Sequence, residues 1–327
     1  MVKKDDWLVS ALVLDGKGSA QKLSADELSR WKPEQGFLWV HLNLSHQGAA
    51  AWLKSSAKLD AWTLQTLTDS DDSRPRTLIH KDALLLVLRT VNLNDKAEPD
   101  DMVFLKLWAT KNRLITLRLH PAINFEDIRN DFKNHEGPVD ANTLIELILE
   151  TTLDSIAATI SDLQEKLDDM EELIIAKNEA NSTYDDLSEM MRQLVIIHRF
   201  LAPEREALGV LTRRETSWFN EVMDRACKEN LHRMERIMED IELLRERIRI
   251  NQDALNAYDV KRAQRNMYML SVIATIFLPL SFLTGLFGMN VGGIPFSSDP
   301  HGLLITFILI AVSGVILLYI FRKLKWI

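Results

Sequence analysis

Residues 267–287 read MYMLSVIATIFLPLSFLTGLF, and the next three residues are Gly288, Met289 and Asn290. The run contains no charged residue, and a membrane-spanning helix needs about 20 predominantly apolar residues to cross about 30 Å of hydrocarbon. A second uncharged run, residues 303–321, follows after the loop 288–302. Two runs of this length at the C-terminal end predict two transmembrane helices rather than two buried core helices.

Charge is divided unevenly around these runs. Residues 1–259 hold 33 bases and 46 acids, whereas residues 260–327 hold six bases and one acid. Three of those bases precede the first run and three lie in the tail 322–327, while the loop 288–302 has no Lys or Arg. The positive-inside rule then places both termini in the cytoplasm and the loop outside. The net charge of −8 argues against a nucleic-acid binder, which is normally basic.

Residues 1–140 have the pattern of a cytoplasmic α/β domain. The single cysteine, Cys227, excludes an internal disulfide and is typical of a reducing compartment. Short apolar or alternating runs predict strands, and Lys111-Asn112 predicts a hairpin turn between the last two. The predicted strands are 8–14, 37–44, 84–93, 103–109 and 114–119. Helices are predicted over 24–31, 47–58, 61–69 and 124–134.

Residues 141–266 change to a coiled-coil-like spacing of three and four. The pattern predicts one helix from about 142, a second over 183–214, and a third from 217. Pro203 predicts a kink or a break in the second helix. No Gly or Pro interrupts residues 210–278, so the third helix is expected to continue as a stalk into the first transmembrane run. Asn251 is the only polar residue at a position where the repeat of the third helix otherwise has apolar residues.

Helical spacing places six residues of the first run on one face, and two interpretations of that face stay open. It could line a pore in an oligomer, with Ser281 supplying oxygens and apolar rings acting as a gate, or it could be a helix–helix contact. The six residues are Met267, Leu270, Ala274, Leu278, Ser281 and Gly285.

The loop residues also allow two interpretations. Asn290 could present neutral oxygens to a hydrated cation, or it could simply cap the helix. Asp299 and His301 could form a weak metal-entry site, or they could be solvated loop residues. Cys, His and carboxylates are the usual zinc ligands, and both runs lack them. A metal in this region is therefore expected to be held through its hydration water.

Gly288-Met289-Asn290, closing the first of two C-terminal spans after a long helix, resembles the signature of the CorA family of metal-ion transporters. The resemblance covers the whole chain and implies a homopentamer around a pore lined by the first span. Val291-Gly-Gly-Ile-Pro295 follows the motif, where magnesium-transporting members usually have an aromatic residue and a Met-Pro-Glu-Leu type segment. This loop resembles the zinc-transporting ZntB branch.

That branch implies zinc uptake across a bacterial inner membrane, coupled to protons as a symporter, with no cofactor besides the transported ion. The partners implied are further copies of the chain, the bilayer and divalent cations. Zinc efflux and a Mg²⁺, Co²⁺ or Ni²⁺ channel stay open as alternatives, as does a membrane-tethered helical scaffold. An enzyme is not expected, because residues 1–140 show no phosphate loop, nucleophile elbow or metal-ligand cluster.

Overall fold

The computed structural model describes residues 7–69, 74–92, 97–120, 125–175, 180–213, 216–289, 295 and 300–323. The chain divides into two compact units, Met1–Gln252 and Asp253–Ile327. One helix, α7 (Glu221–Phe287), contributes to both units.

The first unit is built on a seven-stranded mixed sheet in the order β2-β1-β3-β7-β6-β5-β4. All neighbouring pairs are antiparallel except β3 and β7, which run parallel with Val40 opposite Ile115. The strands are β1 (Leu8–Leu14), β2 (Ala20–Lys22), β3 (Phe37–Asn43), β4 (Arg76–His80), β5 (Ala83–Val91), β6 (Met102–Thr110) and β7 (Arg113–Arg118).

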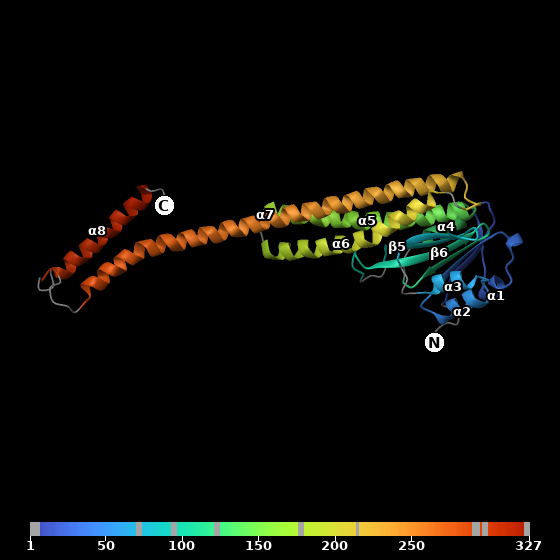
Figure 1. Cartoon of the computed structure of the whole chain (residues 1–327), viewed down its shortest axis with the longest axis horizontal. Coiled ribbons are helices and arrows are strands. Elements are labelled where there is room, and N and C mark those ends of the chain that lie inside the picture. Colours follow the sequence, from blue (N-terminus) through green and yellow to red (C-terminus); the bar gives the residue numbers. More distant parts are fainter. Residues whose placement is uncertain are drawn as a thin grey trace. The chain divides into compact units, whose positions relative to one another are not determined.

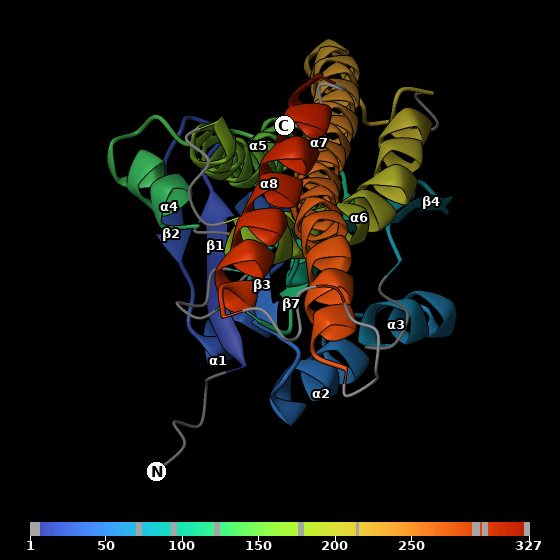
Figure 2. The ribbon, with the colours of Figure 1, turned by 90° about the vertical axis from the view of Figure 1, so that its left-hand side faces the viewer.

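Helices cover both faces of this sheet (Figures 1 and 2). One face packs on the short helices α1 (Ala25–Leu28), α2 (Gln47–Ser55) and α3 (Ala61–Thr68), with Leu53 and Leu67 completely buried against it. The other face, at β4 and β5, packs on α5 (Ala141–Ile175) and α6 (Ala180–Leu211). Burial on both faces explains why the central strands are continuous apolar runs rather than alternating ones.

The remaining elements of the first unit are the turn η1 (Pro33–Gln35), the helix α4 (Glu126–Lys133) and the first part of α7. The segment just before α7 is tied to α5 and to the turn between β4 and β5. Asn142 of α5 donates to the Trp218 carbonyl at 3.2 Å, and the Asp82 carboxylate accepts from the Ser217 backbone N–H at 2.7 Å. The second unit contains the rest of α7 and α8 (Gly302–Lys323).

The predicted strands and long helices agree with the structure to within a few residues, and Lys111-Asn112 does form the β6–β7 turn. β2 and β4 were not predicted. β2 has only three residues, and β4 mixes Arg76 and His80 with apolar positions. A break at Pro203 is wrong, because α6 runs through it without interruption. The domain boundaries at 140 and 266 stay predictions.

Candidate functional site

The C-terminal part of α7 and α8 are long and apolar enough to cross a membrane, and in the described part of the chain no other helix is. No residue is buried in the most apolar window of either helix. Apolar side chains exposed over this length require a non-aqueous environment, so both helices are membrane spans.

The six pore-lining candidates all lie exposed on one face of α7, which we call the exposed stripe. Leu278 is 71% exposed, for example, and Met267 is 66% exposed. The residues two positions beyond the last five of these are each less exposed, and they form a half-buried face. They are Val272, Ile276, Leu280, Leu283 and Phe287.

The half-buried face points away from the exposed stripe, because a step of two residues in an α-helix is a rotation of about 200°. Its Leu280 lies at Gly314 of α8, where an added Cβ would be 4.0 Å from the Leu280 Cδ2 atom. Within one chain, α8 therefore sits on the side of α7 opposite the exposed stripe. The stripe is left for water or for another molecule.

Ser281 is the one hydroxyl on the exposed stripe. Two neighbouring threonines use their hydroxyls within the helix: Thr275 donates to the Ser271 carbonyl at 2.7 Å, and Thr284 donates to the Ser281 carbonyl at 3.0 Å. The Ser281 hydroxyl makes no hydrogen bond with any residue that the structure describes. Its oxygen is therefore available to a ligand from outside the chain.

Pro279 lies inside α7, and the helix continues through it. Proline has no backbone N–H, so the carbonyl of Thr275, four residues earlier, loses its helical donor. Thr275 is exposed and only about 60° from Leu278 around the helix. A carbonyl oxygen is thereby added beside an otherwise apolar part of the stripe.

The first two residues of the motif continue the last turn of α7. Gly288 donates its N–H to the Thr284 carbonyl at 3.0 Å, and Met289 donates to the Leu286 carbonyl at 3.4 Å, which tightens the helix end. Met289 is half exposed. Asn290 and Asp299 lie outside the described residues, so their roles stay predictions. His301 is exposed, one residue before α8 begins.

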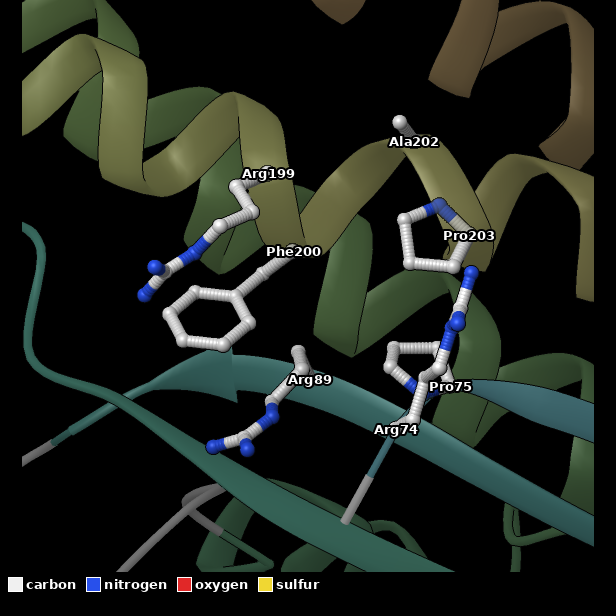
Figure 3. A pocket seen from close by; sticks show the side chains of 7 residues that line it. All are labelled: Arg74, Pro75, Arg89, Arg199, Phe200, Ala202 and Pro203. Carbon is white, nitrogen blue, oxygen red and sulfur yellow. The ribbon is translucent and has the colours of Figure 1, made fainter.

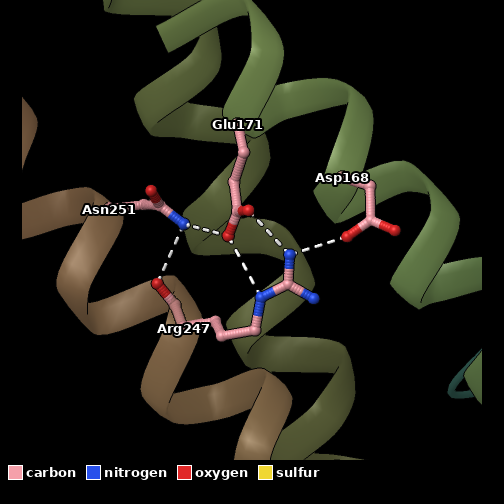
Figure 4. A network of polar contacts seen from close by, with 4 residues as sticks. All are labelled: Asp168, Glu171, Arg247 and Asn251. Atoms are coloured by element: carbon pink, nitrogen blue, oxygen red, sulfur yellow. Dashed lines mark hydrogen bonds and ion pairs between the residues drawn. The ribbon is translucent and has the colours of Figure 1, made fainter. Parts of the chain in front are cut away.

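In the first unit, a network of charged and polar side chains joins α7 to α5, and the sequence pattern did not predict it (Figure 4). Arg247 of α7 donates through Nη2 to the Asp168 carboxylate of α5 at 2.6 Å and to Glu171 at 2.7 Å. Asn251 donates to the same Glu171 carboxylate at 2.8 Å and to the Arg247 carbonyl at 2.9 Å. The Arg247 guanidinium lowers the pKa of Glu171. Asn251, the polar residue in the apolar repeat, is thus one member of a polar network that joins α7 to α5.

Metal ligands are not gathered in the described residues, because no group of three or more His, Cys, Asp or Glu side chains lies close enough to hold an ion. Buried ionisable groups have other surroundings. His41 donates to or accepts from Thr116 at 2.8 Å, and burial lowers its pKa to about 3. Cys227 is buried, and its pKa is raised to about 12 by burial. Neither has the character of a zinc ligand.

Comparison with known proteins gives the family. A family model described as CorA-like Mg²⁺ transporter protein matches residues 34–323. The chain is 35% identical over 322 residues to the divalent cation transporter CmaX of Pseudomonas aeruginosa, covering 98% of this chain and 96% of CmaX. It is 30% identical over 290 residues to the zinc transport protein ZntB of Yersinia enterocolitica, covering 88% of this chain and 86% of that protein.

The folds agree over the full length. The structure of full-length CmaX superimposes with a TM-score of 0.85 at 34% identity and covers 100% of both chains. The CorA magnesium transporter of Methanocaldococcus jannaschii superimposes with a TM-score of 0.83 over 98% of this chain and 99% of that one, at 19% identity. The second likeness concerns the fold alone. The chain therefore belongs to the family of CorA-like Mg²⁺ transporter proteins, and it is a membrane transporter of divalent cations and not an enzyme.

Proposed function

We propose that the chain carries Zn²⁺ through a homopentameric pore in a bacterial inner membrane, with both termini in the cytoplasm. The observation that carries the pore is the exposed stripe of α7, which lies opposite the half-buried face. Two spans in one chain cannot enclose a polar path, so several copies must surround it. Turning the stripes inward would leave α8 on the outside, towards lipid.

The ion is proposed to pass in hydrated form. The exposed stripe contains no ionisable group, and its only side-chain oxygen is that of Ser281. Zinc that had lost its water would need several Cys, His or carboxylate ligands around it. Rings of Ser281 hydroxyls, Thr275 carbonyls and Asn290 amides instead offer neutral oxygens to the first hydration shell. Leu270 and Leu278 would form apolar rings that close the path by dewetting.

The choice of zinc rests on two similarities. The loop Val291–Pro295 resembles that of the zinc-transporting branch, and several curated relatives named zinc transport protein ZntB are about 30% identical to the chain. CmaX, at 35% identity, bears the wider name divalent cation transporter, and it supports the alternative of Mg²⁺, Co²⁺ or Ni²⁺. Ion selectivity therefore has to be measured directly.

Uptake coupled to protons is the proposed direction. Neither residues 267–287 nor residues 303–321 contain Asp, Glu, His, Lys or Arg, which are the usual intramembrane proton carriers. Coupling would have to run through water in the pore or through groups outside the bilayer. Zinc efflux is the alternative, and a pH gradient of either sign distinguishes the two.

The test is ion flux into liposomes containing the purified protein and a zinc-sensitive dye, with and without a pH gradient. Zn²⁺ entry that exceeds Mg²⁺ entry and rises with an inward proton gradient is expected. Replacing Asn290 by Ala should reduce both the flux and the preference for zinc. Zinc flux that ignores the pH gradient would contradict symport, and unchanged selectivity in the Asn290 variant would contradict the role of the motif.

Ser281→Ala tests the stripe, with Ser313→Ala as its matched control. The Ser313 hydroxyl of α8 already donates to the Leu309 carbonyl at 2.8 Å, so its loss should leave flux unchanged. Loss of the Ser281 ring should lower zinc flux at least about fivefold, since a hydrogen bond contributes about 1 kcal/mol. Equal zinc flux in both variants would contradict the proposal that the exposed stripe lines the ion pathway.

A further inference from the structure

A pocket of about 650 Å³ lies in the first unit, between the β4–β5 edge of the sheet and α6 (Figure 3). This volume is within the range of small-molecule sites, about 300–1,000 Å³. Three arginines line the pocket together with apolar residues, and none of the lining residues that the structure describes is acidic. The lining consists of Arg74, Pro75, Arg89, Arg199, Phe200, Ala202 and Pro203.

Two of the arginines are held at one end by the Phe200 ring. The guanidinium carbon of Arg89 is 4.5 Å from the ring centroid and that of Arg199 is 5.1 Å from it, so the two carbons are at most about 10 Å apart. Figure 3 shows Phe200 between these side chains. Partial burial lowers the pKa of Arg89, Glu204 acts against that shift, and the charge of Arg199 adds to it. The pair is therefore a site of positive charge that an anion would stabilise.

The third arginine lies at the other end. Arg74 extends beside Pro75 toward Pro203 (Figure 3), and its side chain is exposed. Neither the Arg74 nor the Arg199 guanidinium donates a hydrogen bond or forms an ion pair with any residue that the structure describes. Each therefore retains its full set of N–H donors, whose fork geometry matches a phosphate.

Among the described acids, Glu204 acts on the charge of Arg89. Glu204 follows Pro203 and is 1% exposed, and it accepts the Arg89 backbone N–H at 3.0 Å. Burial raises the pKa of Glu204 to about 8, so the carboxyl group is mostly protonated at neutral pH. The Arg89 guanidinium itself donates to the Met102 carbonyl at 2.8 Å, which fixes its position. The pocket therefore combines fixed positive charge with an apolar wall.

We propose that this pocket binds a small soluble organic phosphate of nucleotide size. The phosphate would lie at the Arg89–Arg199 pair, the body of the ligand along Pro75, Ala202 and Pro203, and a second polar group at Arg74. The proposal concerns the first unit and goes beyond ion transport. Its test does not depend on which ion the protein transports.

The test is calorimetric titration of the full-length protein in detergent, freed of metal with EDTA, with sodium ATP and separately with sodium phosphate. ATP is expected to bind saturably, with one molecule per chain, and more tightly than phosphate. Arg199→Gln should weaken both ligands at least about tenfold, and Arg74→Gln should weaken ATP alone. Both side chains are exposed, so the variants should keep the fold.

Arg205→Gln is the matched control, because Arg205 is an exposed arginine of the same helix that does not line the pocket. It should change ATP affinity less than about twofold. The absence of saturable ATP binding would overturn the proposal, and so would an equal loss in Arg205→Gln and Arg199→Gln. Phosphate binding as tight as ATP binding would overturn the nucleotide-sized ligand.

Discussion

The network at Arg247 makes a quantitative prediction about how firmly α7 is held to α5. Arg247→Met keeps most of the side-chain length but removes three hydrogen bonds to Asp168 and Glu171. About a quarter of the Arg247 side chain is exposed, so each charge-assisted bond contributes less than the 1.5–3 kcal/mol of a buried one. Glu171 also keeps its bond from Asn251 after the substitution. We expect a loss of about 1–2 kcal/mol.

Amide hydrogen exchange of the full-length protein measures this loss locally. A change of about 1–2 kcal/mol lowers the protection of the α7 amides around residues 244–252 by about five- to thirtyfold. The losses of stability from Glu171→Gln and Arg247→Met should be less than additive in the double variant, because both substitutions remove the same Arg247–Glu171 interaction.

Arg249→Met is the control. Arg249 lies two residues away and pairs with Glu246 at 3.5 Å, with both side chains more than half exposed. Its loss should cost less than about 0.5 kcal/mol. If Arg247→Met and Arg249→Met lower protection equally, or if neither changes it, the network does not hold α7 to α5.

Three further predictions concern buried groups of the first unit. Lys106 is fully buried and its Nζ donates to two carbonyls at the end of α3, so Lys106→Met should lower the free energy of unfolding by about 1–3 kcal/mol in a chemical denaturation, and an unchanged midpoint would contradict this. Glu204 has a pKa raised to about 8, so the unfolded chain releases its proton first as pH rises. The wild type should therefore lose stability between about pH 4.5 and 8 relative to Glu204→Gln, by up to about 4 kcal/mol, and parallel melting curves against pH would be inconsistent with a buried acid. Cys227 is buried with a pKa raised to about 12, so maleimide should label it at pH 7.5 only after denaturation, and rapid labelling of the native protein would refute its burial.

The sequence correctly predicted strands that are buried on both faces. It did not predict contacts between residues that are far apart along the chain. β5 and β6 were found because both of their faces are covered and their residues are apolar throughout. The Arg247 network was not found, since its partners are 76 to 80 positions apart and look like ordinary surface charges on each helix. Only the polar residue Asn251, at an apolar position of the repeat, indicated a polar contact there.

For the proposed transport site, helical spacing predicted which residues share the exposed stripe. It could not predict the side on which α8 lies, because α8 is apolar all round and its pattern selects no face. The position of Gly314 beside Leu280 supplied that direction. The role of Asn290 depends on the family signature, because this residue lies outside the described part of the chain.

The absence of charged residues from residues 267–287 and 303–321 has a consequence for the electrical behaviour of the membrane segments. A membrane potential does work only on charges that move through it, about 2.3 kcal/mol per unit charge for each 100 mV. Spans without charges contribute no gating charge, so voltage acts on the permeating ion and on any protons that accompany it. A divalent cation crossing alone would gain about 4.6 kcal/mol per 100 mV, inside negative. Current through this protein should therefore follow voltage smoothly, without the steep threshold of a voltage-gated channel.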